Sequence, residues 1–221
     1  MNKERMKMNT RREMLAGMGL ATLGLVGLNA AWSKLGSTAD TLRSAALGDV
    51  TPFPNVKLIT HEGETVRFYD DLVHNKVVAI NMMYAQCAGI CPIATANLLQ
   101  VQDMLGERVG RDVFMYSITL QPELDNPAGL KRYAERHGIG SGWKFLTGDP
   151  ADIELLRYKL GFFDREAGLD DVKENHTGMV RIGNDAVNRW SMAPSLAEPQ
   201  QIMATINHLD PKAIHTHITQ G

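Results

Sequence analysis

Apolar residues along this chain form two kinds of run, and each kind predicts a different element. Val77–Tyr84 is almost continuously apolar, and Asp112–Leu120 largely so, as expected for strands that are covered on both faces of a sheet. From Ile93 to Leu105 the apolar residues follow helical spacing, and Gly106 is a suitable stop for that helix. The pattern therefore predicts a buried strand, a crossover helix and a second buried strand, in that order.

The segments on either side predict further elements of both kinds. They are a hairpin over Asn55–Tyr69, a helix from Pro127 to near Gly138, an apolar run at Trp143–Leu146 with a turn at Thr147–Pro150, a helix from Ala151 to about Leu160, strands at Met179–Ile182 and Asn188–Ser191, and a last helix from about Glu198 to His208. Strands that alternate with helices predict an α/β arrangement.

The N-terminal segment differs from the rest of the chain. Residues 1–12 carry five basic side chains against one acidic one, and residues 14–31 carry no charge. A basic head before a modest apolar segment is typical of an export signal, and the adjacent Arg11 and Arg12 resemble a twin-arginine signal. We expect a protein that the export machinery handles, located in the periplasm or at the outer face of the inner membrane.

These features divide the chain into four parts. We expect residues 1–33 to be a twin-arginine-type signal peptide or a membrane anchor, and residues 34–50 to be a linker. The folded domain is expected over residues 51–212, followed by a C-terminal tail at 213–221. Whether the signal is cleaved or anchors the protein stays open at this point.

The overall charge argues against nucleic acid as a partner. Lys and Arg number 23 against 25 Asp and Glu, which gives a net charge of −2, and no long basic run occurs. We also find no nucleotide-binding loop, serine triad or pair of catalytic carboxylates in the sequence.

Candidate chemistry lies in the only two cysteines of the chain, Cys87 and Cys91, which follow the first buried strand. A disulfide between residues so close in sequence closes a short loop and stabilises the fold little. Paired thiols at the end of a strand suit redox exchange or a soft metal ion instead. Pro92 favours the first turn of a helix, so we expect Cys91 at a helix N-terminus that stabilises a thiolate. Cysteines between a strand and its crossover helix point to a thioredoxin-like fold.

A metal ion held by two sulfur atoms needs at least one further ligand. His176 follows the polar stretch Phe163–Glu174, which looks like a surface loop able to fold over the cysteine edge. Spacing by itself favours an ordinary surface histidine at this position. His215 and His217 could also hold a metal, although they stand in a tail that is expected to fray. Spacing therefore leaves the third ligand open.

Three motifs taken together resemble the Sco/SenC copper-chaperone family. They are Cys87-Ala-Gly-Ile-Cys91-Pro92 after a hydrophobic strand, Phe145-Leu-Thr-Gly148 farther along, and His176-Thr177 before a late strand. The resemblance implies a thioredoxin-like fold, a central mixed sheet flanked by helices with an N-terminal hairpin extension. It also implies one copper ion, Cu(I) or Cu(II), bound by Cys87, Cys91 and His176.

The same resemblance implies an exported metallochaperone. Such a protein delivers copper to a respiratory oxidase copper site, or reduces the thiols of that site, so its partner is an acceptor protein with a copper site or a dithiol. The chain departs from the family pattern at Asn175, where an aspartate is usual, and at Ala85, where a threonine is usual. These departures leave the acceptor open.

An enzymatic alternative uses the same two cysteines without an obligatory metal. In a periplasmic thiol-disulfide oxidoreductase, Cys87 would be the better exposed catalytic thiol that attacks, and Cys91 the one that resolves. A peroxiredoxin-like peroxidase is a weaker third hypothesis, because the chain has no Thr-x-x-x-Cys pattern before its thiols.

Overall fold

The computed structural model describes residues 52–166 and 168–210. Its elements are β1 (Lys57–Thr60), β2 (Thr65–Arg67), a π-helical turn η1 (Phe68–Val73), β3 (Val77–Met83), α2 (Ile90–Leu105), η2 (Gly106–Arg108), β4 (Val113–Thr119), α3 (Pro127–Arg136), β5 (Trp143–Gly148), α4 (Pro150–Lys159), η3 (Lys173–His176), β6 (Met179–Asn184), η4 (Asp185–Val187), β7 (Arg189–Pro194) and α5 (Pro199–Leu209).

Several predictions concern segments that lie outside the described residues. These are the twin-arginine signal or anchor, the linker at 34–50, and the C-terminal tail with His215 and His217. Within the described part, no helix combines the length and the hydropathy that a membrane span requires.

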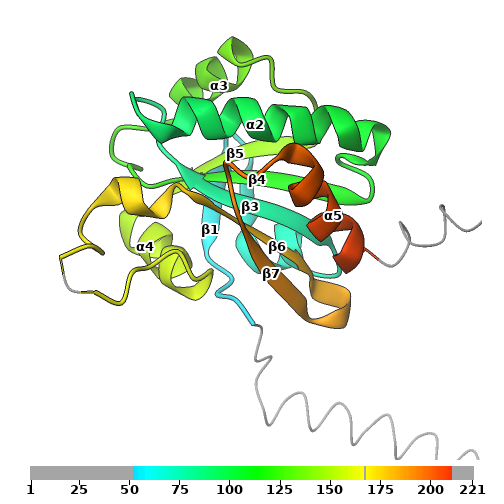
Figure 1. The fold of residues 1–221 in the computed structure, drawn as a ribbon. Helices are drawn as coiled ribbons and strands as arrows, with labels where there is room; N and C mark the ends of the chain where they lie inside the picture. Colours follow the sequence, from blue (N-terminus) through cyan, green and yellow to red (C-terminus); the bar gives the residue numbers. More distant parts are fainter. Residues whose placement is uncertain (1–51, 167, 211–221) are drawn as a thin grey trace, which may run out of the picture. The chain divides into compact units, whose positions relative to one another are not determined.

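The strands of the described residues form one mixed sheet in the order β2-β1-β5-β4-β3-β6-β7 (Figure 1). β3, β4 and β5 run parallel, while β1 and β6 pair antiparallel with β5 and β3. Every residue of β3 is buried, which is why this strand shows no alternation of apolar and polar positions. The predicted α/β class and the central mixed sheet are confirmed.

The predicted hairpin is present and extends the main sheet. β1 and β2 pair antiparallel, with Leu58 opposite Val66, and β1 pairs in turn with β5. The Leu58 side chain is fully buried, so the hairpin contributes to the core of the domain.

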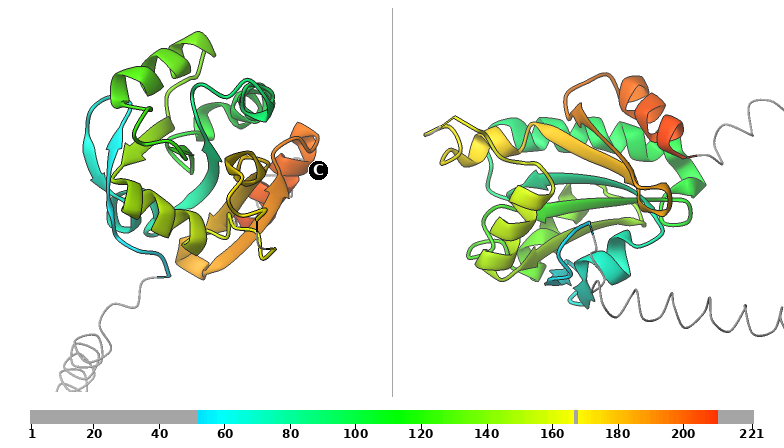
Figure 2. Two further views of the ribbon diagram at one scale, coloured as in Figure 1. Left: turned by 90° about the vertical axis from the view of Figure 1, so that its left-hand side faces the viewer. Right: turned by 90° about the horizontal axis from the view of Figure 1, so that it is seen from below.

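The helices cover both faces of the sheet (Figures 1 and 2). α2 and α3 connect parallel strands that follow one another in the same direction across the sheet, so right-handed crossovers place both on one face. α5 packs beside α2 on that face, and α4 lies on the opposite one. The cysteine segment therefore leaves the central strand and enters a helix that the sheet supports along its length.

Two predicted boundaries were wrong near the candidate site. α2 begins at Ile90, three residues before the expected start, because Gly89 ends the turn and Pro92 fits the first helical turn, where no backbone donor is needed. β5 continues through Thr147 and Gly148, which were expected to form a turn, because both still pair with β1. The first helical turn of α2 therefore contains Cys91.

Candidate metal and thiol-exchange site

The cysteine segment lies at the edge of the sheet where the parallel strands end. β3 ends at Met83, and a turn closed by the 3.2 Å hydrogen bond from the Cys87 N–H to the Tyr84 carbonyl leads into α2. Because β3 and β4 are parallel, the loop after β4 reaches the same edge. Asp125, in that loop, accepts hydrogen bonds from the Ala85 N–H at 2.9 Å and from the Thr119 hydroxyl at 2.6 Å.

Asp125 is a functional residue that the sequence interpretation missed. It is only 2% exposed, and its hydrogen bonds with the Ala85 N–H and the Thr119 hydroxyl hold the backbone just before Cys87 in place. The available signal was its position shortly after the second buried strand, since the ends of parallel strands meet at one edge of a sheet.

Both cysteines are free thiols and both are buried, with Cys87 7% exposed and Cys91 1% exposed. Burial, and to a smaller extent the hydrogen bond with Cys87, raises the pKa of the Cys91 thiol to about 12. Burial also acts to raise the pKa of Cys87, but hydrogen bonds from Cys91, from the Tyr84 hydroxyl and from backbone N–H groups outweigh it, so that this pKa is lowered. Cys87 is therefore the thiol of the pair that ionises first.

This asymmetry corrects one expectation. The helix N-terminus was expected to stabilise a thiolate at Cys91, and Cys91 does stand in the first turn of α2. Its side chain points into the core, however, where loss of water outweighs the favourable dipole. The helix instead supplies donors to the neighbouring sulfur of Cys87, which accepts from the N–H groups of Cys91 and Gly89.

The segment that carries His176 packs against the cysteines from the other side. The Tyr84 hydroxyl lies 2.8 Å from the Glu174 carboxylate and also beside the Cys87 sulfur, and its single proton is shared between these two acceptors. The Thr177 side chain forms a hydrogen bond with Cys91. Tyr84 and Glu174 were not identified from the sequence, because a polar residue in a loop gives no sign of its long-range partner. The predicted approach of this loop to the cysteine edge is observed.

His176 itself is buried, with only 5% of its surface exposed, and is not the surface histidine that spacing favoured. Its Nε2 atom lies 2.8 Å from the Asp170 carbonyl oxygen and 3.2 Å from Arg157 Nη1. The Asp170 carbonyl can only accept and the Arg157 guanidinium can only donate, so Nε2 can form a hydrogen bond with only one of them. The shorter contact, with the carbonyl, places the proton on Nε2 and the lone pair on Nδ1. No described residue forms a hydrogen bond with Nδ1, which leaves that atom available as a ligand.

Ion pairs between the buried Arg157 and two more exposed carboxylates fix the surroundings of His176. Arg157 donates two hydrogen bonds to the Asp170 carboxylate at 2.7 and 2.9 Å and two to Glu154 at 2.9 and 2.6 Å. Hydrogen bonds from Arg157 and Tyr158 hold the pKa of Asp170 well below its usual range. Since Asp170 also supplies the carbonyl that binds His176, this network holds the imidazole ring in place.

The structure brings together two of the three predicted ligands. Cys87 and Cys91 share a hydrogen bond, whereas the His176 ring is directed to Arg157 and Asp170. Among the described residues, no three His, Cys, Asp or Glu side chains form a group that could hold a metal ion. A site with all three ligands therefore requires the segment around His176 to shift toward the sulfur atoms.

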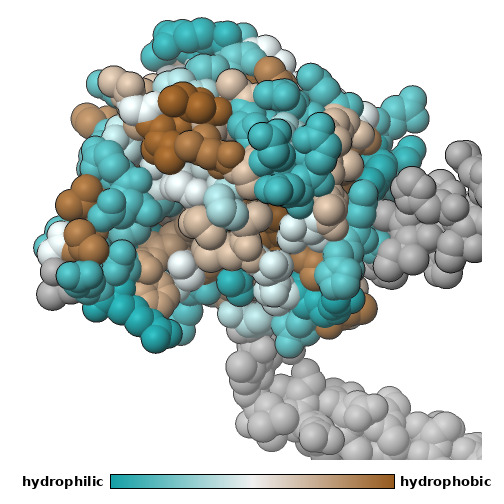
Figure 3. Space-filling model, in the orientation of Figure 1, coloured by the Kyte–Doolittle hydropathy of each residue, from teal (hydrophilic) through white to brown (hydrophobic). Residues whose placement is uncertain are grey.

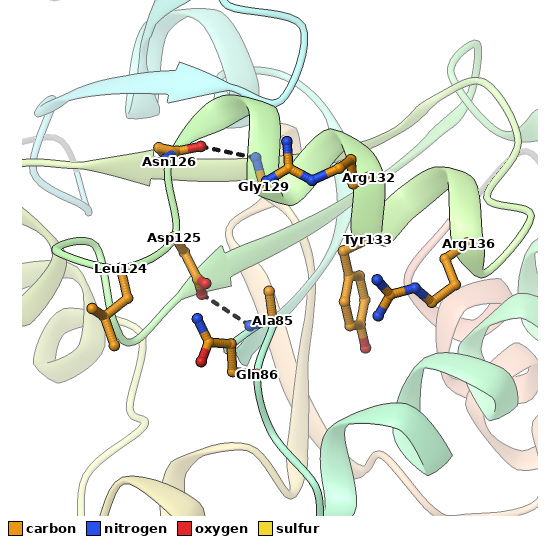
Figure 4. Close-up of a pocket in the computed structure, with 9 residues that line it drawn as sticks. All are labelled: Ala85, Gln86, Leu124, Asp125, Asn126, Gly129, Arg132, Tyr133 and Arg136. Atoms are coloured by element: carbon orange, nitrogen blue, oxygen red, sulfur yellow. Dashed lines mark hydrogen bonds between the residues drawn. The ribbon is translucent and has the colours of Figure 1, made fainter.

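Two surface features flank the cysteine segment. On one side is an apolar patch over the amino-terminal half of α2 (Figure 3), the helix in which Ile93 is 60% exposed. On the other is a hollow of about 170 Å³ between the cysteine segment and α3 (Figure 4). The hollow is lined by Ala85, Gln86, Leu124, Asp125, Asn126, Gly129, Arg132, Tyr133 and Arg136.

Comparisons with known proteins agree with this fold. A family model described as SCO1/SenC matches residues 51–209. The SCO1 protein homolog of Bacillus subtilis is 34% identical over 82 residues, which are 36% of this chain and 42% of that relative. The chain thus matches less than half the length of this curated relative.

Two solved structures show the same architecture over most of their length. ScoI of Bradyrhizobium japonicum, solved with copper bound, has 21% identity and a TM-score of 0.55, covering 69% of this chain and 96% of that one. BsSco, described as a member of the Sco family of cytochrome c oxidase assembly proteins with a disulfide switch, has 20% identity and a TM-score of 0.57, covering 72% and 94%. The predicted thioredoxin-like fold is confirmed.

Proposed function

Because this chain belongs to the SCO1/SenC family, we propose that it is an exported copper metallochaperone that serves a respiratory oxidase copper site. Copper is cargo in this proposal, and the residues that would hold it are Cys87, Cys91 and His176. The relatives support the proposal, since ScoI of Bradyrhizobium japonicum was solved with copper and BsSco belongs to a family of oxidase assembly proteins.

The observation that carries the proposal is the chemical form of the three side chains. The lowered pKa of Cys87 makes the thiolate, the form that binds metal, easier to reach, and Cys91 forms a hydrogen bond with it. His176 has an unpartnered Nδ1, and its Nε2–H is held by a backbone carbonyl. Histidine ligands of metals are commonly oriented by such a carbonyl, which fixes the tautomer and the ring. Two sulfurs and one imidazole suit copper.

Loading would couple copper binding to a movement of the histidine segment. The Thr177 and Glu174 contacts already join this segment to the cysteines, so a local shift suffices and the sheet need not change. In the loaded protein, thiolates of the acceptor would replace the ligands of this chain one at a time, and the copper would pass over without a change in oxidation state.

A copper titration of the purified, reduced chain tests the proposal. We expect His176→Ala to weaken Cu(I) binding at least about tenfold, which corresponds to about 1.4 kcal/mol for the lost ligand. Cys87→Ser and Cys91→Ser should each weaken Cu(I) binding more than that. The matched control is His74→Ala, an exposed histidine before β3, at the opposite end of the sheet. Unchanged copper affinity in His176→Ala would refute the assigned ligand set.

The second candidate function, thiol-disulfide exchange, is favoured by the difference between the two thiols. The Cys87 thiolate would attack an acceptor disulfide, forming a mixed disulfide and releasing one acceptor thiolate. Cys91 would lose its proton and attack Cys87, releasing the second acceptor thiolate. The chain would finish with a Cys87–Cys91 disulfide, and the acceptor would have gained two electrons as two thiolates, which take up the proton released by Cys91 and one further proton from solvent.

The titration also separates the two functions. Loss of copper binding in His176→Ala with an unchanged rate of disulfide reduction would assign the histidine to metal binding alone. We also propose that residues 1–33 direct export, by a twin-arginine-type signal, to the periplasm or the outer face of the inner membrane. Replacing Arg11 and Arg12 by lysine should then retain the chain in the cytoplasm, as cell fractionation would measure.

A further inference from the structure

We propose that the hollow between the cysteine segment and α3 is the docking site for an acidic segment of the protein that exchanges with Cys87. The inference rests on the proposed function and adds the place where the partner binds and the chemistry by which it is recognised. The first argument for this proposal is the position of the hollow. The hollow is lined by Ala85 and Gln86, the two residues that immediately precede Cys87 in the chain (Figure 4).

The second argument is unneutralised positive charge. Arg132 and Arg136 project from α3 along the hollow, both are exposed, and neither forms an ion pair with any described residue. Like charges one helical turn apart repel each other, and a bound counter-charge would relieve this repulsion. Lys131 adds a third positive charge to α3, against Glu135 as its one acid.

The one carboxylate in the hollow does not supply that counter-charge. Asp125 Oδ2 already accepts from the Ala85 N–H and the Thr119 hydroxyl, and Asp125 is almost completely buried. The chain as a whole carries a net charge of −2, so α3 presents a local positive surface on a slightly acidic protein. Such a surface beside a reactive thiol attracts an acidic partner and orients it for exchange.

The geometry also suits a peptide segment better than a small anion. The two guanidinium groups stand one turn apart on α3, and Gln86 and Asn126 offer side-chain amides at other points of the rim. Guanidinium groups bind carboxylates through paired hydrogen bonds. A segment with successive Asp or Glu side chains would engage both arginines while its neighbouring cysteine reaches Cys87.

Binding of a synthetic peptide tests this docking site without copper and without disulfide exchange. The probe carries a disulfide-linked cysteine pair next to a run of glutamates, and a matched peptide carries glutamines instead. Both are titrated by fluorescence anisotropy into the full chain with Cys87→Ser and Cys91→Ser. We expect the acidic peptide to bind about tenfold tighter than the glutamine peptide at low ionic strength, and this advantage to disappear at high salt.

Arg132→Gln with Arg136→Gln should remove the advantage of the acidic peptide. The matched control is Arg111→Gln with Arg189→Gln, which removes the same charge from exposed positions at the opposite end of the sheet, before β4 and at the start of β7. If the arginine variant binds the acidic peptide as tightly as the parent, or if both peptides bind the parent equally, the docking site is wrong. Failure of the copper titration would leave this result unaffected, so the two proposals fail separately.

Discussion

The different environments of the two thiols predict that Cys87 reacts far faster than Cys91. Burial first, and then the hydrogen bond with Cys87, raises the pKa of Cys91 from 9.0 to about 12. This shift lowers the thiolate fraction of Cys91 about a thousandfold, at any pH below 9, relative to a thiol with a pKa of 9.0. Because the thiolate is the nucleophile, Cys91 should be almost inert to alkylation at neutral pH.

Single-cysteine variants make this difference measurable. In metal-free, reduced protein, iodoacetamide should modify Cys87 in Cys91→Ser with a pH midpoint below 9.0, because its hydrogen bonds favour the thiolate. The reciprocal variant Cys87→Ser should react at least a hundredfold more slowly, on the order expected for a buried thiol. Mass spectrometry across a pH series gives both rates.

A second pair of variants identifies the hydrogen bond between the sulfurs. Serine at position 91 can still donate to Cys87, whereas alanine cannot, so Cys91→Ala should have the higher alkylation midpoint. One hydrogen bond to a charged group contributes about 1.5–3 kcal/mol, which corresponds to roughly one to two pH units. Equal midpoints for serine and alanine, or equal reactivity of Cys87 and Cys91, would refute the reasoning.

Three further predictions concern the residues around the thiols. Tyr84→Phe removes a hydroxyl donor and should raise the pKa of Cys87, which the same alkylation series would detect as a higher midpoint. Asp125→Ala leaves two donors without their acceptor, the buried Thr119 hydroxyl and the part-buried Ala85 N–H, and should lower the free energy of unfolding in urea by about 2–5 kcal/mol. Asp125→Asn keeps an acceptor and should lose less. Hydrogen bonds from the buried Arg157 lower the pKa of Asp170 in the folded protein. Asp170 therefore contributes its full stabilisation at pH values above its pKa in the unfolded chain, about 3.9, and this stabilisation is lost as the pH falls toward its lower pKa in the folded protein. The protection factors of the amides before β6, which compare the measured exchange rate with the intrinsic rate at the same pH, should therefore fall in acid. Asp170→Asn should show lower protection factors already at neutral pH, and unchanged protection factors would contradict the role of the ion pair.

Local patterns in the sequence determined most of the fold. A strand covered on both faces has to be apolar throughout, so β3 could be recognised as central without knowing its neighbours. The hairpin, the crossover helix and the two late strands carry periodicities of their own, and each was predicted close to its observed place. The boundaries that were wrong, at the start of α2 and the end of β5, depend on strand pairing and on the geometry of one turn.

In the candidate site, too, local sequence predicted some features, and contacts between distant segments decided the others. The sequence by itself determined that two thiols lie together after the central strand, because their spacing and Pro92 are local features. Only the tertiary structure decided which thiol is the thiolate, since the pKa of each depends on burial and on Tyr84, whose hydroxyl lies beside Cys87. It also decided that His176 is buried and held by Asp170, because hydrogen bonds between distant segments leave no periodic trace in a sequence.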